Sequence, residues 1–403
     1  MIISVLRVSH IICTAIVAAV ALTACNDEAA MPFDPTVIPE ASDPQRAMLI
    51  YAVASNNLYY YLSKDMTEMI AGATSVDLKN NRVVVYSVTP DGASTLSQLI
   101  AVPGKSAPEF HVIKEYPRLP LSVSRERISE VIGDFCEMYD EYPHKSLTFW
   151  SHASGWTPSF TTLPHSLFPP RAVEMKSFGA DYYEGREYNC NITDLADAVP
   201  EGVFDFIWFD CCYMSNIETL YQMRDKCDYL VAYPTEVYAT GLPYDQILPL
   251  VMKGDADLGA AAGALFRYYD SNEMAVTVSV VRTDRLGEIA AAAADIIDDS
   301  CPPQKLSLRN YATGGLGPFF DMRHTLTQYA AATSDKTARL DQAMQAAVVF
   351  TIASERDFRG NVIEPEKYSG MTIHLPDDDY QSPYNCFYRE LDWYRDTRNE
   401  FPL

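Results

Sequence analysis

Two short segments each place a reactive side chain directly after a run of large apolar residues. Residues 150–156 (WSHASGW) carry His152, and residues 209–214 (FDCCYM) carry the adjacent thiols of Cys211 and Cys212. A thiol and an imidazole together support acyl transfer, in which the thiol attacks a carbonyl carbon and the imidazole moves the proton. Residue chemistry alone leaves either Cys211 or Cys212 as the nucleophile.

The position of these segments after predicted strands indicates that they meet in the folded chain. The runs at 147–150 (LTFW) and 204–209 (FDFIWF) are typical of buried strands. Ligands of open α/β sheets bind at the carboxyl ends of strands, so we expect His152 and the thiol to face each other there. The Cys segment also leads into a predicted helix at 217–224, whose positive N-terminal end would favour a thiolate.

Composition and missing motifs exclude other classes of function. The sequence has no Gly-x-Ser-x-Gly elbow, no His-Glu-x-x-His and no P-loop. Its net charge of −23 disfavours nucleic acid and anionic membrane surfaces and favours cationic partners. A hydrophobic content of 48% is typical of a packed globular protein.

Strands and helices are expected to alternate along the chain. Strands are expected at 47–54, 82–88, 96–102, 110–116 and 229–233, and helices at 58–71, 124–139 and 194–199. Such alternation predicts an α/β sheet covered by helices on both faces. The Pro-rich stretch 157–188 is expected to be a loop. Beyond about residue 285 we expect mainly helix, at 286–297 and 338–352, and a last short strand at 371–374.

The N-terminal residues predict export and a lipid anchor. Residues 11–22 are apolar but too few to span a bilayer, and 22–25 (LTAC) match a bacterial lipobox, so residues 1–25 are expected to be a signal that ends at a lipidated Cys25. The Pro-rich residues 26–45 are expected to be a disordered tether. We therefore expect a lipoprotein held on a bilayer, at the outer membrane or cell surface.

The number of cysteines indicates at least one free thiol. Of nine cysteines, Cys13 lies in the signal and Cys25 would be lipidated, which leaves seven. An odd number in an exported protein means that at least one thiol stays unpaired or pairs elsewhere. A cysteine nucleophile requires such a thiol.

The two segments resemble the motifs of the clostripain family of cysteine peptidases. Residues 150–156 are similar to the family's His motif, and 209–214 to its Asp-Ala-Cys-x-Met nucleophile motif. The similarity extends to 56–57, 177–179, 218, 227–232 and 241–245, and more weakly to 368–371 and 391–394. It covers residues 46–290 well, which we expect to form the catalytic domain, with 291–403 a mainly helical C-terminal subdomain.

This resemblance implies a fold, an activity and a set of site residues. The implied fold is caspase-like: a mostly parallel sheet with helices on both faces, plus a mainly helical C-terminal extension. The implied activity is cleavage of peptide or protein substrates after Arg or Lys. Matched by position, His152 is the catalytic imidazole and Cys212 the nucleophile, while Asp210 helps to bind the basic side chain. Backbone N–H groups of Ala153 and Cys212 would hold the oxyanion.

Two departures from the family pattern and several alternatives bear on these assignments. Ala153 stands where the family often has Gly, which would strain a positive φ, and Cys211 stands where the family has Ala. Asp210 is also suited to cap the following helix. Glu236 and Asp245 are alternative acids for the pocket.

Related peptidases are often cut between the His and Cys motifs, and some use calcium. The corresponding basic residues here are Arg171, Lys176 and Arg186. No EF-hand-like loop occurs and 377–379 (DDD) is expected to be a solvated turn, so we predict neither a cofactor nor a metal site. The rival interpretation is a surface lipoprotein of this fold that binds peptides or proteins with little catalytic activity.

Overall fold

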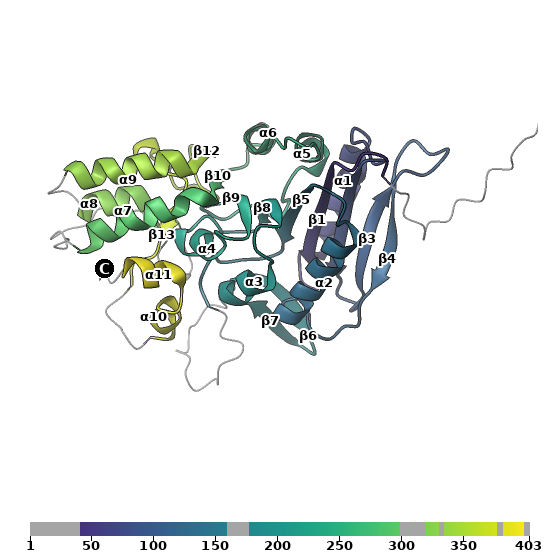
Figure 1. The fold of residues 1–403 in the computed structure, drawn as a ribbon, viewed down its shortest axis with the longest axis horizontal. Helices are drawn as coiled ribbons and strands as arrows, with labels where there is room; N and C mark the ends of the chain where they lie inside the picture. The colour runs from purple at the N-terminus through teal and green to yellow at the C-terminus, as the bar shows by residue number, and fades with distance from the viewer. Residues whose placement is uncertain are drawn as a thin grey trace, which may run out of the picture. The chain divides into compact units, whose positions relative to one another are not determined.

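A nine-stranded sheet forms the centre of the computed structural model, which describes residues 41–158, 177–298, 311, 319–329, 334–376 and 382–398 (Figure 1). The strand order is β12-β10-β9-β8-β5-β1-β2-β3-β4. The strands are β1 (Arg46–Val53), β2 (Asn81–Val88), β3 (Ser94–Ile100), β4 (Glu109–Glu115), β5 (His144–Trp150), β8 (Phe204–Asp210), β9 (Cys227–Ala232), β10 (Thr277–Arg282) and β12 (Val348–Ala353).

The sheet is mixed, with a parallel centre. Strands β2, β1, β5, β8 and β9 pair in parallel, whereas β3 and β4 at one edge and β10 and β12 at the other pair antiparallel. The central strands are buried along nearly their whole length because both faces are covered. Continuous apolar runs such as 204–209 are therefore what this sheet requires.

Helices cover both faces, as the alternation in the sequence predicts. One face packs against α1 (Tyr59–Ala73), α5 (Tyr244–Val251) and α6 (Leu258–Ser271). The other packs against α2 (Arg125–Met138), α3 (Ile192–Ala198), α4 (Ile217–Gln222), α7 (Leu286–Asp298), α8 (Met322–Tyr329), α9 (Ser334–Ala347), α10 (Pro383–Tyr388) and α11 (Asp392–Thr397). A small sheet pairs β11 (Phe320–Asp321) with β13 (Thr372–Ile373).

The chain changes direction across the sheet between β1 and β5. After β1 it passes through α1 on one face to β2, whereas after β5 it passes through α3 on the other face to β8. The loops that leave the carboxyl ends of these two neighbouring strands therefore diverge. Such a switch point is the usual ligand site of an open α/β sheet.

Two predictions of local structure are wrong. Within the stretch 157–188 that we expected to be a loop, β6 (Phe178–Tyr183) and β7 (Arg186–Cys190) form a hairpin whose turn residues, Glu184 and Gly185, both have positive φ. A two-residue turn of this kind matches the twist of antiparallel strands. The predicted helix 338–352 ends at Ala347, and its last residues form β12, whose β-branched and aromatic side chains pair with β10.

Several expectations lie outside the described residues: the signal, Cys25, most of the tether, and 377–379. Within the described ranges, no helix combines the length and apolarity needed to cross a membrane. Among the cysteines that the structure describes after the tether, Cys136, Cys190, Cys211, Cys212 and Cys227 are free thiols.

Candidate active site

His152 lies in the loop that follows β5 and is held from both sides. The Ser151 hydroxyl donates to the carbonyl oxygen of Val53 at 2.8 Å, which ties the loop to β1. The Gly179 N–H donates to the His152 carbonyl at 2.8 Å, which ties it to β6. The half-buried imidazole places Nε2 2.7 Å from Oδ1 of Asn57, in the loop after β1.

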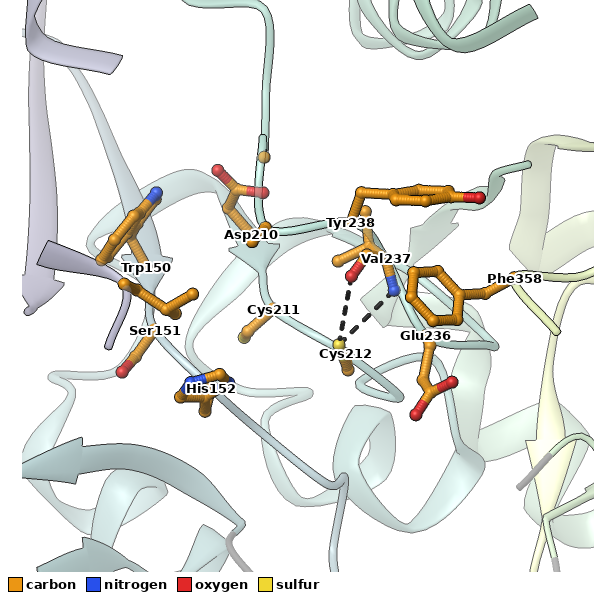
Figure 2. A pocket seen from close by; sticks show the side chains of 13 residues that line it. Trp150, Ser151, His152, Asp210, Cys211, Cys212, Glu236, Val237, Tyr238 and Phe358 are labelled. Atoms are coloured by element: carbon orange, nitrogen blue, oxygen red, sulfur yellow. Dashed lines mark hydrogen bonds between the residues drawn. The ribbon is translucent and has the colours of Figure 1, made fainter. Parts of the chain in front are cut away.

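Cys212 lies two residues beyond β8, and its sulfur faces the loop after β9. The Val237 N–H donates to Sγ at 3.4 Å, and the thiol donates to the Val237 carbonyl oxygen at 3.6 Å (Figure 2). Burial raises the pKa of the Cys212 thiol to about 12, with Glu236 and Asp210 adding to the rise. The thiol is therefore the resting form, and it needs a base to remove its proton.

The expected role of a helix N-terminus at the nucleophile is wrong. The chain takes a left-handed turn at Tyr213 (φ 60°) and then pairs with the chain after β9, through Tyr213 N–H to Thr235 and Ser215 N–H to Tyr233. Helix α4 begins only at Ile217, with Asn216 as its cap. Asp210 therefore does not cap this helix, and the backbone N–H and carbonyl groups of Val237 are hydrogen-bonded to Sγ.

Adjacent Cys211 occupies a different environment from Cys212. Its side chain is 1% exposed and belongs to the hydrophobic core on the face of the sheet that α2, α3 and α4 cover, whereas Cys212 is half-buried. Burial raises the pKa of the Cys211 thiol well above its ordinary value, and the neighbouring Cys212 and Asp210 add to this. Of the two adjacent thiols, Cys212 is thus the more accessible to a substrate.

The backbone around Ala153 is unstrained. Ala153 forms a bridge with Phe178, but the hydrogen bonds of this bridge use the His152 carbonyl and the Ser154 N–H rather than the Ala153 N–H. Among the described residues, the non-glycine positions with positive φ are Glu184, Tyr213, Glu273 and Arg398, so Ala153 is not one of them. The requirement for glycine falls instead at Gly155, whose φ is 66°.

Asp210 ends β8 inside the same pocket and is almost fully buried. Its carboxylate accepts hydrogen bonds from the Leu242 N–H at 3.1 Å, the Tyr244 hydroxyl at 3.2 Å and the Tyr233 hydroxyl at 3.5 Å. Burial raises the pKa of Asp210 to about 7, although these hydrogen bonds oppose the rise. The backbone of Gly241 also lies close to this carboxylate, since a Cβ atom added to Gly241 would lie 2.9 Å from Oδ2 of Asp210.

A second acid that sequence reasoning missed, Asp65 of α1, lies behind the pocket. It is 1% exposed and accepts a hydrogen bond from Nε1 of the pocket residue Trp150 at 2.7 Å. Burial raises the pKa of Asp65 to about 9, and the charge of Asp210 adds to the rise. Only its position on α1, revealed by the fold, connects it with the site.

The two alternative acids are placed differently. Glu236 lines the pocket, but both of its oxygens accept hydrogen bonds from Arg359, at 2.9 and 3.0 Å, in an arrangement that fixes the segment before Val237. Asp245 is exposed in the first turn of α5 and does not line the pocket. Of these acids, Asp210 is the one that lines the pocket without such an ion pair.

One pocket thus brings together residues from five segments of the chain, which follow β1, β5, β8, β9 and β12 (Figure 2). It is lined by Leu58, Trp150, Ser151, His152, Asp210, Cys211, Cys212, Glu236, Val237, Tyr238, Ala239, Gly241 and Phe358. Phe358 comes from beyond β12, and its ring packs on Tyr238 with centroids 4.5 Å apart. Sequence patterns did not predict this contribution of the C-terminal region.

Among the processing residues, only Arg186 is described. It is exposed at the start of β7, where it pairs with Tyr183 across the hairpin. Arg171 and Lys176 lie outside the described residues. Across the described ranges, no three His, Cys, Asp or Glu side chains are grouped so that they could hold a metal ion.

Comparisons with known proteins identify the family and the fold of the chain. The model of the clostripain family matches residues 50–399. A secreted C11 cysteine protease from Bacteroides thetaiotaomicron, solved with an irreversible peptide inhibitor, has a TM-score of 0.73 and 24% identity over 88% of this chain and 98% of its own. An inactive zymogen C11 protease from Parabacteroides distasonis has a TM-score of 0.73 and 27% identity over 90% and 99%. Among curated proteins, none matches.

Proposed function

Because this chain belongs to the clostripain family of cysteine peptidases, we propose that it is an exported endopeptidase that cleaves after Arg or Lys. Cys212 is the nucleophile and His152 is its base. The observation that carries the proposal is that His152, Cys212 and the buried acid Asp210 line one pocket at the carboxyl ends of β5 and β8. A thiol, an imidazole and a carboxylate there supply attack, proton transfer and recognition of a cation.

The reaction begins with proton transfer from the Cys212 thiol to His152. The pKa of this thiol, raised by burial to about 12, makes a base necessary at neutral pH. Sγ then attacks the carbonyl carbon of the substrate, and the backbone N–H groups of Ala153 and Cys212 stabilise the oxyanion. The protonated imidazole gives its proton to the leaving amine, which leaves a thioester on Sγ, and water activated by His152 releases the acid product.

Recognition of a basic side chain rests on Asp210. A cation that enters the pocket meets a carboxylate already oriented by Leu242, Tyr244 and Tyr233. In a site of low polarity, a guanidinium or ammonium group then replaces the proton that burial favours on this carboxyl group. The substrates are therefore peptides or proteins with an accessible Arg or Lys.

The sequence motif at 22–25 supports export and attachment to a bilayer through acyl chains on Cys25. Metabolic labelling with a fatty acid tests this: the wild type should be labelled and Cys25→Ser should not. Equal release of both forms into the medium would contradict the anchor.

The activity is tested with fluorogenic peptides that differ only in the residue before the cleaved bond. Arg and Lys should be cleaved, whereas Asp, Asn and Ala should be cleaved slowly or not at all. A protein that only binds peptides would show no turnover with any member of the panel, and that result would favour the rival interpretation.

A further inference from the structure

Asn57 stands on a turn that the structure fixes tightly. The neighbouring Asn56 is buried, and its side-chain amide donates to the carbonyl oxygens of Val53 at 3.0 Å and Ala180 at 2.7 Å. Its side-chain oxygen accepts from the Leu58 N–H at 2.8 Å. Asn57 therefore lies between Asn56, whose side chain is bonded to β1 and β6, and Leu58, whose N–H is bonded to Asn56, and its own side chain is exposed.

A second anchor holds the same turn from the other side. The Ser55 hydroxyl donates to the fully buried carboxylate of Asp181 at 2.6 Å. That carboxylate also accepts from the Ser122 N–H at 2.8 Å and forms an ion pair with Arg118. The turn after β1 is consequently held by hydrogen bonds to β1 and β6, and a side chain needs such a fixed backbone in order to orient a partner.

The amide oxygen of Asn57 lies 2.7 Å from Nε2 of His152, across the switch point between β1 and β5. An amide oxygen only accepts hydrogen bonds, so Nε2 must be the nitrogen that carries the proton. The lone pair of the neutral ring is then on Nδ1, which is the nitrogen that can accept a proton. The contact also restricts the plane of the ring, because the Ser151 hydroxyl already donates to Val53 and the His152 carbonyl already accepts from Gly179.

We propose that Asn57 is the positioning residue for the imidazole: it accepts a hydrogen bond from Nε2, directs Nδ1 towards Cys212 and stabilises the imidazolium that forms during attack. This inference rests on the proposed function, because it assigns the orientation of the proposed base. A structural role alone does not account for the contact, since Asn57 is exposed and, among the described residues, its side chain bonds to the ring of His152.

Three variants separate positioning from structure. Asn57→Ala removes the acceptor, so kcat with an Arg substrate should fall roughly 10-fold to 100-fold while KM changes little. Asn57→Asp keeps an acceptor of the same size and adds a negative charge, which raises the pKa of the imidazolium by about 1 unit. Its kcat/KM should therefore recover at high pH, and the acid limb of its profile should move to higher pH. Asn272→Ala removes an exposed amide that donates to the Tyr268 carbonyl, and because neither residue lines the pocket it should change neither kcat nor the profile.

An NMR titration of the histidine rings makes the inference testable even without turnover. In the Cys212→Ala background, the full-length protein and its Asn57→Asp variant should differ in the titration of His152 by about 1 pH unit. Asp210, Cys211, Glu236 and Tyr238, the other titratable groups that line the pocket in this background, are the same in both proteins. An unchanged titration of His152 would overturn the inference about Asn57. If the titration of His152 shifted by about 1 pH unit as expected, but the protein with Cys212 intact showed no peptidase activity, only the proposed function would be overturned.

Discussion

A Cβ atom on Gly155 would lie 2.8 Å from the carbonyl oxygen of Tyr213, because the His152 loop and the Cys212 loop touch at this glycine. The same Cβ would collide with Nδ2 of Asn216, which itself donates to the Tyr213 carbonyl at 2.5 Å. Gly155 also has φ 66°, a conformation that other residues adopt only with strain. The absence of a side chain here thus allows the His152 loop and the Cys212 loop to touch.

Gly155→Ala should therefore reduce both stability and activity. The strained φ and the crowding together should lower the free energy of unfolding by roughly 2–5 kcal/mol. Gly202→Ala is the matched control, because Gly202 has φ 62° but nothing within 4 Å of its Cβ position. It should cost about 1 kcal/mol and leave kcat unchanged. Equal effects of the two substitutions in urea unfolding and in kcat would contradict the importance of this contact.

The affinity for basic substrates should depend on pH through Asp210. Its pKa is raised to about 7, so below this pH the carboxyl group is protonated and lacks the charge that binds a guanidinium. KM for an Arg substrate should fall as pH rises through this region and then level off. The acids Asp65 and Glu68 and the hydroxyls of Tyr233 and Tyr244 are the other titratable groups that act on it.

The control for this prediction is Asp210→Asn, which keeps the shape of the side chain. It should abolish the pH dependence of KM and lower kcat/KM for Arg about 10-fold to more than 100-fold, since a charge-assisted hydrogen bond contributes roughly 1.5–3 kcal/mol. The kcat/KM of this variant for substrates with Ala before the cleaved bond should change little. An unchanged preference for Arg would point to Glu236, the other acid that lines the pocket, as the group that binds the cation.

The ion pair of Arg359 with Glu236 should support the nucleophile indirectly. Arg359→Ala frees Glu236 beside Cys212 and loosens the segment that presents Val237 to the sulfur. Alkylation of Cys212 by iodoacetamide and kcat/KM should both fall roughly twofold to fivefold, as expected for a partly exposed pair. Arg339→Ala, which breaks an exposed pair with Asp295, serves as the comparison. Identical rates in both variants would refute this role.

Self-processing between the His and Cys motifs should favour the sites before the hairpin. Arg186 is paired in β7, so cleavage after it would first require the strands to separate, whereas a peptidase cleft accepts an extended, unpaired segment. We expect N-terminal sequencing of wild type to reveal a new terminus at residue 172 or 177, and Cys212→Ala to stay intact. A single uncut chain with full activity would exclude self-processing, and a terminus at 187 would contradict the argument from the hairpin.

The central strands and the main pocket residues could be predicted from the sequence because their signals are local. Apolar runs such as 204–209 mark strands that are buried on both faces, and His152 and Asp210 follow the ends of such runs. Cys212 could be chosen over Cys211 only through the family motif. The structure adds a physical reason, since Cys211 is buried in the core.

The remaining parts of the site depend on contacts between distant segments. Asp65 lies on an amphipathic helix, where nothing in the local pattern separates a buried acid from an exposed one. Phe358 and Arg359 reach the pocket because β12 joins the edge of the sheet, a pairing that a helical pattern at 338–352 concealed. The hairpin of β6 and β7 was hidden by the prolines before it, although its Glu184-Gly185 turn is a recognisable signal.

The most direct test of the central claim compares the two adjacent thiols in one assay. Full-length wild type, Cys212→Ala and Cys211→Ala are each assayed with an Arg fluorogenic peptide, and folding is checked by circular dichroism. Turnover should vanish in Cys212→Ala, whereas Cys211→Ala, which restores the alanine of the family motif, should keep most of the wild-type rate. Turnover that survives in Cys212→Ala, or that is lost only in a well-folded Cys211→Ala, would contradict the assignment of Cys212 as the nucleophile.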